Sequence, residues 1–257
     1  MTAAPTATPL APELSVVVPT YNERTRIAEL IASIFEVFRT HAVDGELVIV
    51  DDNSPDGTGD LVDGLVPAHA PRLVVVHRTG KLGLGSAVMK GFLTASAPVL
   101  GVMDADFSHP PSALPHLLEV LRHTRVDAVI GSRYIEGGEV QNWPFSRLML
   151  SRLACILAWP LTPVRDATSG FFLIRRLVVE GVDIQSGGFK ICLELLMRSR
   201  VQSVAEVPYV FVDRTVGTSK MSLREALGYF SQLRQLYGLA LARRRSSIRY
   251  QRVPPPT

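Results

Sequence analysis

Two carboxylates separated by a single residue, Asp104-Ala105-Asp106, follow the apolar run PVLGVM. Such a run is typical of a buried strand, and on an extended chain residues i and i+2 point the same way. The two carboxylates would therefore repel each other unless a cation lay near them. Hard oxygen ligands favour Mg²⁺ or Mn²⁺, often shared with substrate phosphates. The pattern predicts a divalent metal site, and the alternative is a pair of turn or capping aspartates.

Acidic groups also follow two earlier apolar runs. The run LSVVV leads into PTYNE (19–23), and ELVIV leads into Asp51 and Asp52. In open α/β sheets, ligands bind beyond the carboxyl ends of the strands. Three strands that deliver acidic groups to one edge favour a single ligand site there.

Two other phosphate-binding motifs are excluded by their spacing. The segment GKLGLG (80–85) lacks the order GxxxxGK[ST] of a P-loop. The first strand is followed by PTYN in place of GxGxxG. An ATPase or a dinucleotide-dependent enzyme is therefore disfavoured, and the glycines are explained by a tight entry into the next helix.

Three basic residues lie where anionic ligands would need them. Arg133 follows the fifth strand, and Arg214 and Lys220 lie in the segment VDRTVGTSK. A diphosphate donor and an anionic acceptor both require such cations. Surface salt bridges are the alternative for each of them.

The elements that must position these groups alternate along the chain. Strands are expected at 14–18, 46–50, 72–77, within 98–106, and at 127–132, with helices at 27–38, 84–96 and 110–123. Later come helices at 145–158, 189–200 and 222–245, with strands at 171–176 and 206–212. This order predicts an α/β fold with a mostly parallel central sheet flanked by helices, and a C-terminal helical extension.

Composition fits one folded unit. Of the 257 residues, 47% are hydrophobic and 20% charged, which allows a large core. We expect a flexible tail at 1–13, one catalytic domain at 14–245, and a basic, Pro-rich tail at 246–257. The longest uncharged apolar run, 153–164, is too short to span a bilayer. We therefore expect a cytoplasmic protein, and buried thiols at both cysteines.

At this point the motifs match a known family. The chain resembles the family 2 glycosyltransferases of GT-A fold and, within them, the polyprenyl- or dolichyl-phosphate mannose synthases. The resemblance rests on VVVPTYNE, VDDNSPDGTGD, KLGLGSAVMKGF, MDADFSHPP, GSRY with EGGEVQNWP, SGFFLIRR, GFKICLELL and VPYVFVDRTVGTSKM. These motifs extend over most of the chain, from residue 14 to about residue 225.

The resemblance implies a role for each matching residue. The nucleoside part of a nucleotide-sugar donor would be held by Pro19, Tyr21, Glu23, Val50 and Asp52. Asp104, Ala105 and Asp106 would face the donor diphosphate, and a metal would be held by Asp104, Asp106 and Ser108. Arg133, Arg214 and Lys220 would contact the donor phosphates or the acceptor phosphate, and with Asp106 would form the catalytic set.

The resemblance further implies a reaction. Mannose would pass from GDP-mannose to a polyprenyl phosphate with inversion at the anomeric carbon. The rival donor is a UDP-hexose such as UDP-glucose. A lipid monophosphate is already anionic near neutral pH, so it needs positioning and electrostatics more than a general base.

A lipid acceptor implies contact with a membrane. The helix at 222–245 is followed by arginines, and it either lies on an anionic membrane or packs on its own core. Segment 143–163 is a candidate lining for the lipid chain. We expect a peripheral protein on the cytoplasmic face of a membrane, held directly or through a separate membrane-anchor subunit. A nucleic-acid or membrane-binding module that uses the basic C-terminus is the alternative of another class, and no nucleic-acid partner is expected.

Overall fold

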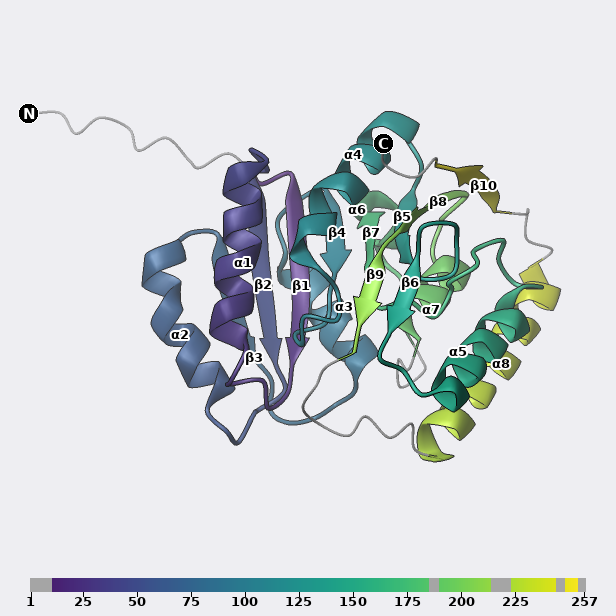
Figure 1. The fold of residues 1–257 in the computed structure, drawn as a ribbon, viewed down its shortest axis with the longest axis horizontal. Coiled ribbons are helices and arrows are strands. Elements are labelled where there is room, and N and C mark those ends of the chain that lie inside the picture. The colour runs from purple at the N-terminus through teal and green to yellow at the C-terminus, as the bar shows by residue number, and fades with distance from the viewer. Residues whose placement is uncertain (1–10, 185–189, 214–222, 244–247, 254–257) are drawn as a thin grey trace, which may run out of the picture.

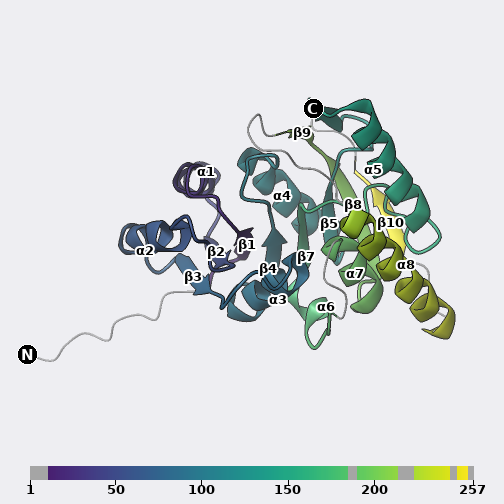
Figure 2. The ribbon, with the colours of Figure 1, turned by 90° about the horizontal axis from the view of Figure 1, so that it is seen from below.

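The computed structural model describes residues 11–184, 190–213, 223–243 and 248–253, in which a central sheet is covered by helices on both faces (Figures 1 and 2). The strand order of the sheet is β10-β8-β5-β7-β4-β1-β2-β3. Its strands are β1 (Leu14–Thr20), β2 (Gly45–Asp51), β3 (Leu73–His77), β4 (Val99–Val102), β5 (Ala128–Ser132), β7 (Phe172–Arg175), β8 (Ser203–Pro208) and β10 (Arg249–Arg252).

All of these strands are parallel except β7, which is antiparallel to both β4 and β5. The expected α/β fold with a mostly parallel sheet is therefore confirmed. The continuous apolar runs explain the central position of β1 and β2, because a strand covered on both faces has no polar side. Both strands are almost entirely buried.

Helices cover the two faces with separate cores. The helices are α1 (Ile27–Thr40), α2 (Thr58–His69), α3 (Leu84–Thr94), α4 (Leu114–Thr124), α5 (Phe145–Ala158), α6 (Arg176–Val179), α7 (Ile191–Arg198) and α8 (Leu223–Arg243), with a 3₁₀ turn at Pro111–Ala113. One core includes side chains of α1, α2 and α4. The other includes side chains of α3, α5, α6, α7 and α8.

Several segments differ from expectation. No helix was expected at α2, and the Asp-Ala-Asp element, expected at the end of a strand, lies in a turn after β4. The run EVPYVFV forms two strands, because β8 ends at Pro208 and β9 (Val210–Val212) leaves the main sheet to pair with β6 (Glu139–Gln141). Residues 249–252, expected within a basic tail, form β10 and pair in parallel with β8. Ile248, just before this strand, is buried in the core, which holds the segment against the sheet edge.

Helix α8 packs on the core and also exposes apolar side chains. Tyr229, Leu233 and Leu236 are buried, whereas Leu227 and Phe230 are 69% and 56% exposed. The helix lies beside α5 (Figures 1 and 2), to which the Tyr229 hydroxyl donates a 2.7 Å hydrogen bond at the carbonyl of Ala154. Among the residues described, no helix combines the length and apolar character needed to cross a bilayer.

Candidate functional site

The carboxyl ends of β1, β2 and β4 meet at one edge of the sheet, the lower edge in Figure 1. Thr20 and Asp51 are register partners at the ends of β1 and β2. The Thr20 hydroxyl donates to Asp51 Oδ1 at 3.2 Å, and the Ser54 hydroxyl donates to the same oxygen at 2.5 Å. Asp51 therefore fixes the turn after β2, and Asp52 follows it at the edge.

Asp52 is paired with an arginine that the sequence did not single out. Arg78 follows β3, and its Nη1 lies 2.5 Å from Asp52 Oδ1, with both side chains buried. Burial raises the pKa of Asp52, and the nearby Arg78 charge opposes that rise. Arg78 also donates to the Ser86 hydroxyl at 2.6 Å, which ties Asp52 to the start of α3.

The other residues expected at the nucleoside lie around Asp52. Tyr21 is 37% exposed, and Lys81 Nζ lies 4.2 Å from the centroid of its ring. The Glu23 N–H donates to the Thr58 hydroxyl at 3.0 Å. Pro19 and Val50 are register partners. The Val50 side chain is fully buried in the core, so it has no free surface for a ligand.

The Asp-Ala-Asp element turns sharply after β4. Ala105 is buried, and Phe107 has a positive φ of 62°. Asp106 Oδ1 accepts hydrogen bonds from the Ser108 hydroxyl at 2.5 Å and from the Ser108 N–H at 3.1 Å. Ser108, expected as a metal ligand, thus holds the Asp106 carboxylate by direct contact. Arg26 Nη1 donates to the Asp106 carbonyl at 3.2 Å and braces the same turn.

His109 braces Asp104 from the other side. Its Nδ1 accepts the Asp104 N–H at 3.0 Å, and its Nε2 lies 3.7 Å from Asp104 Oδ2. Because Nδ1 accepts a hydrogen bond, the ring proton lies on Nε2, which faces the carboxylate. Burial lowers the pKa of His109. A side chain at Gly170 would come within 3.4 Å of both Asp104 oxygens, so the glycine keeps the space beside them free.

This donor set fits a divalent cation. Burial raises the pKa of Asp104, and the neighbouring Asp106 charge raises it further. A cation between the two carboxylates would offset both the burial of charge and the repulsion between the carboxylates. Carboxylate oxygens are also the ligands that Mg²⁺ and Mn²⁺ prefer. Within the described ranges, no group of three or more His, Cys, Asp or Glu side chains is arranged around one point. The remaining ligands of such an ion would be water or substrate phosphate oxygens.

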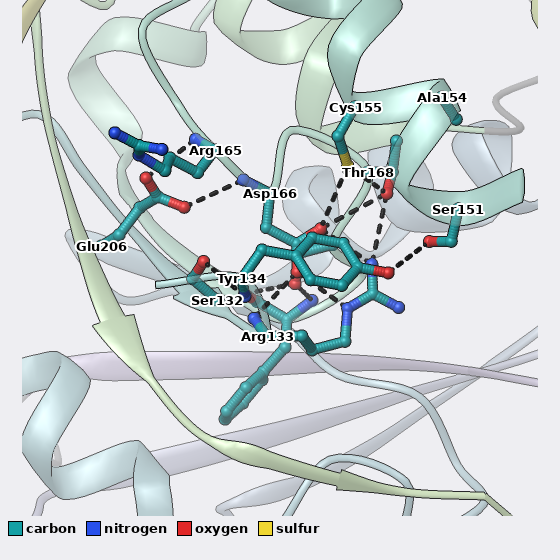
Figure 3. Close-up of polar contacts among 12 residues, drawn as sticks. Ser132, Arg133, Tyr134, Ser151, Ala154, Cys155, Arg165, Asp166, Thr168 and Glu206 are labelled. Atoms are coloured by element: carbon teal, nitrogen blue, oxygen red, sulfur yellow. Dashed lines mark hydrogen bonds and ion pairs between the residues drawn. The ribbon is translucent and has the colours of Figure 1, made fainter. Parts of the chain in front are cut away.

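Arg133 is held by a buried carboxylate (Figure 3). Its Nε and Nη2 each donate to Asp166 at 2.8 Å, and its N–H donates to Asp166 Oδ2 at 3.0 Å. The Thr168 hydroxyl accepts from Nη2 at 3.2 Å. Burial alone would raise the pKa of Asp166, but the Arg133 charge and hydrogen bonds outweigh it and lower that pKa. Asp166 is therefore a carboxylate that fixes the guanidinium in a bidentate geometry.

Aromatic rings surround the same guanidinium. The Cζ of Arg133 lies 5.4 Å from the centroid of Trp143 and 5.5 Å from that of Phe211. Arg147, at the start of α5, lies over Trp143 at 4.1 Å and pairs with Asp213 at 2.6 Å. Neither Asp166 nor Arg147 was predicted as a site residue from the sequence. The polar segment RDATSG between apolar stretches was the one available signal for Asp166.

The acidic and basic ends of the site are close enough to influence each other. The charges of Lys190 and Arg133 both lower the pKa of Asp104, although burial dominates and raises it. Burial and the Arg133 charge in turn lower the pKa of Lys190. Two expected cations, Arg214 and Lys220, lie outside the described residues. The charges of Asp104, Arg133 and the previously unassigned Lys190 therefore influence one another.

Sequence comparisons identify relatives of this chain. Residues 15–183 match the family Glycosyl transferase family 2. A dolichol-phosphate mannosyltransferase from Pyrococcus furiosus is 40% identical over 231 residues, which cover 88% of this chain and 63% of that protein. The chain thus spans less than two thirds of that relative. A polyprenol monophosphomannose synthase from Mycolicibacterium smegmatis is 41% identical over 226 residues, covering 82% of this chain and 83% of the relative.

A structural comparison agrees on the fold. A mannosyltransferase from Pyrobaculum calidifontis, solved in complex with GDP-Man and Mn²⁺, superposes with a TM-score of 0.61 at 20% identity. The match covers 88% of this chain and 65% of that one. At this identity the likeness concerns the GT-A fold alone. Together with the sequence match over most of the chain, it leads to one conclusion: this protein is a glycosyltransferase that belongs to glycosyl transferase family 2.

Proposed function

We propose that this chain transfers mannose from GDP-mannose to a polyprenyl (dolichyl-type) phosphate, with Mg²⁺ or Mn²⁺ held by Asp104 and Asp106. The observation that carries the proposal is the pair of carboxylates after β4, at the carboxyl edge of the sheet, with the buried cation Arg133 near enough to lower the pKa of Asp104. The two aspartates suit a metal-bound diphosphate, and Arg133 suits a second phosphate. The relatives named for dolichol-phosphate and polyprenol-phosphate mannose transfer support the choice of sugar and acceptor.

The donor would lie across the edges of β1, β2 and β4. Tyr21, Glu23 and Asp52, with the main chain near Pro19 and Val50, form its nucleoside end. The diphosphate would face Asp104, Ala105 and Asp106. Bound there, the divalent ion would neutralise the charge that develops on the departing nucleoside diphosphate. Ser108 donates to the Asp106 carboxylate, and His109 accepts the Asp104 N–H with its Nε2 at 3.7 Å from the Asp104 carboxylate, so the two residues keep the carboxylates oriented.

The surroundings of Arg133 favour an acceptor that is already anionic. Two acids on the β5 and β8 side of Arg133, Asp166 and Glu206, are fully buried and accept several hydrogen bonds each. Neither has a free oxygen to take a proton from a hydroxyl group. A lipid monophosphate needs no such base, because it is ionised near neutral pH.

The reaction then proceeds by in-line displacement. An acceptor phosphate oxygen attacks the anomeric carbon, and a new carbon–oxygen bond forms as the bond to the donor diphosphate breaks. The electron pair leaves with the nucleoside diphosphate, and the configuration inverts. Arg133, together with Arg214 and Lys220, would orient the phosphates, which is the positioning that makes a displacement fast.

The lipid tail of the acceptor calls for an apolar surface, and α5 offers one. Its exposed apolar residues are Phe145, Met149, Leu150, Leu153 and Ile156, and Trp159 follows the helix. Leu227 and Phe230 extend this surface onto α8. We include in the proposal that this α5–α8 surface rests on a membrane, because contiguous exposed apolar side chains mark such sites.

The test offers donors side by side. Purified protein, Mg²⁺ or Mn²⁺ and a polyprenyl phosphate are incubated with GDP-mannose or with UDP-hexoses. Mannosylated lipid from GDP-mannose alone is the expected result. Labelled lipid from a UDP-hexose alone would replace the proposed donor, and no labelled lipid from any donor would overturn the proposal.

A further inference from the structure

Glu206, on β8, is a buried acid whose partners all belong to the surroundings of Arg133. Its side chain has 0% exposure. One oxygen accepts the N–H of Arg165 at 2.9 Å, and the other accepts the N–H of Asp166 at 3.0 Å (Figure 3). Burial raises the pKa of Glu206, and the Arg165 N–H and the nearby Ser132 hydroxyl oppose that rise. Burying a carboxylate destabilises the fold unless its oxygens are hydrogen-bonded. The hydrogen bonds to both oxygens of Glu206 are therefore needed to keep it buried.

The two backbone bonds fix the chain at the residue that holds Arg133. Consecutive N–H groups, from Arg165 and Asp166, each need an acceptor, and Glu206 supplies one oxygen to each. These two hydrogen bonds fix the backbone at Asp166 and so set the direction of its side chain. Asp166 then forms the bidentate pair with Arg133. Among the described residues, the hydrogen bonds of Arg133 go to Asp166 and Thr168 and none goes to Glu206. Glu206 can therefore act on Arg133 only through Asp166.

We propose that Glu206 is a positioning residue of the transferase, which locks the Arg165–Asp166 turn so that Asp166 presents the Arg133 guanidinium to the acceptor phosphate. The inference rests on the proposed function for the identity of that acceptor. The positioning itself is independent of it, because the contacts exist without any substrate.

The C-terminal strand lies near the same turn. Tyr250 lies on β10, whose register places it beside Val204 of β8. Burial raises the pKa of Tyr250, and the nearby Glu206 charge raises it further. The segment expected to be a tail is therefore close to Glu206.

The decisive variant is Glu206→Gln. A glutamine keeps the shape but offers an acceptor oxygen on one side and an NH₂ group on the other, which would face a backbone N–H. The readout is the ¹⁵N-edited NMR signal of the Arg133 Nε–H group, assigned by its loss in Arg133→Lys. In the unaltered protein this buried, ion-paired proton should exchange slowly with solvent, and in Glu206→Gln at least about tenfold faster.

Glu46 supplies a matched control. It is another buried glutamate, at the amino end of β2 and far from the site, and it accepts hydrogen bonds from Ser15 and Ser96. Glu46→Gln should lower the unfolding midpoint in a similar way and leave the Arg133 signal unchanged. Equal exchange rates in Glu206→Gln and the unaltered protein would overturn the proposal, as would equal acceleration in both variants.

Kinetics give a second readout. With Arg133 displaced, the KM for polyprenyl phosphate should rise about tenfold or more in Glu206→Gln, while the KM for GDP-mannose stays the same. A parallel rise in both KM values would contradict the inference. If Glu206→Gln does not fold, Glu206→Asp takes its place, because its shorter side chain cannot reach both N–H groups. Faster exchange is again expected, and an unchanged rate would count against the inference. Failure of the proposed function would instead leave the unaltered protein inactive while the NMR result still stands.

Discussion

Arg78 and Asp52 form an ion pair beneath the expected nucleoside end of the site, with their side chains 7% and 8% exposed and the nearest atoms 2.5 Å apart. Removing one partner would leave a buried charge without compensation. Arg78→Met should therefore lower the free energy of unfolding by about 3 kcal/mol, measured by urea denaturation. Arg39, paired with Glu36 on the exposed side of α1, is the control, and Arg39→Met should leave the unfolding midpoint unchanged.

Neutralising the Asp-Ala-Asp element should separate catalysis from folding. Asp106→Asn removes a charge that the divalent ion needs, so the turnover number should fall by at least about 100-fold. The unfolding midpoint should stay close to that of the unaltered protein, because the amide oxygen can still accept from Ser108. Asp63→Asn, at a half-exposed pair with His77, is the control with full activity. Turnover that survives in Asp106→Asn would remove the metal role.

The Arg133–Asp166 pair should make stability depend on acidic pH. The pKa of Asp166 is lowered in the folded protein, against the opposing effect of burial. Its stabilising contribution is therefore complete above the unfolded pKa of about 3.9 and is lost as the pH falls through the lower folded value. The gap in unfolding free energy between the unaltered protein and Asp166→Asn should be constant above about pH 5 and shrink below about pH 4. A gap that widens on acidification would contradict the pairing.

Cys155 and Cys192 should resist thiol reagents. Both are buried, and burial raises the pKa of Cys155 to about 11 and that of Cys192 well above its usual value. The thiolate is the reactive form, so little of it exists at about pH 8. Mass spectrometry after treatment with iodoacetamide should find both thiols unmodified in the native protein and alkylated in urea. Rapid native labelling of either one would refute this prediction.

The α5–α8 surface should govern attachment to lipid. Leu153→Gln with Trp159→Gln removes two side chains that are 48% and 53% exposed. Burial of one such side chain is worth about 1.5 kcal/mol or more, so binding to vesicles of anionic phospholipid should fall by at least about tenfold in a sedimentation assay. Leu177→Gln, on α6, changes a leucine that is 69% exposed and lies on another helix, and it should bind as before. Equal loss in both proteins would point to a non-specific effect.

The strands and helices could be predicted because their apolar patterns are local. β1 and β2 are continuous β-branched runs, and α1 buries Ile27, Leu30, Ile31 and Ile34 at helical spacing. The strand β10 has the sequence RYQR, in which no apolar pattern marks a strand. It is held by pairing with β8, a partner more than 40 residues earlier in the chain.

The part of the site that could be predicted also depends on a local pattern. Asp104 and Asp106 could be singled out by their spacing, but the structure places them in a turn after β4 and not on the extended strand from which their shared direction was argued. Arg133 was named as a phosphate ligand, and that role stays a prediction. Its partner Asp166 lies 33 residues away, and Glu206 a further 40 residues on. Such contacts depend on which strands become neighbours, and sequence spacing alone does not contain that information.

The reversed direction of β7 divides the site between two stretches of chain. Residues 14–106 build the edge where the donor is proposed to bind, and β7 enters the sheet from that same edge, so the segment 166–171 reaches the site before its strand begins. Under the proposed function, donor and acceptor recognition would be encoded in separate halves of the chain. A chimera that keeps residues 1–126 and takes its remainder from a relative should then inherit the relative's lipid preference while retaining the original nucleotide.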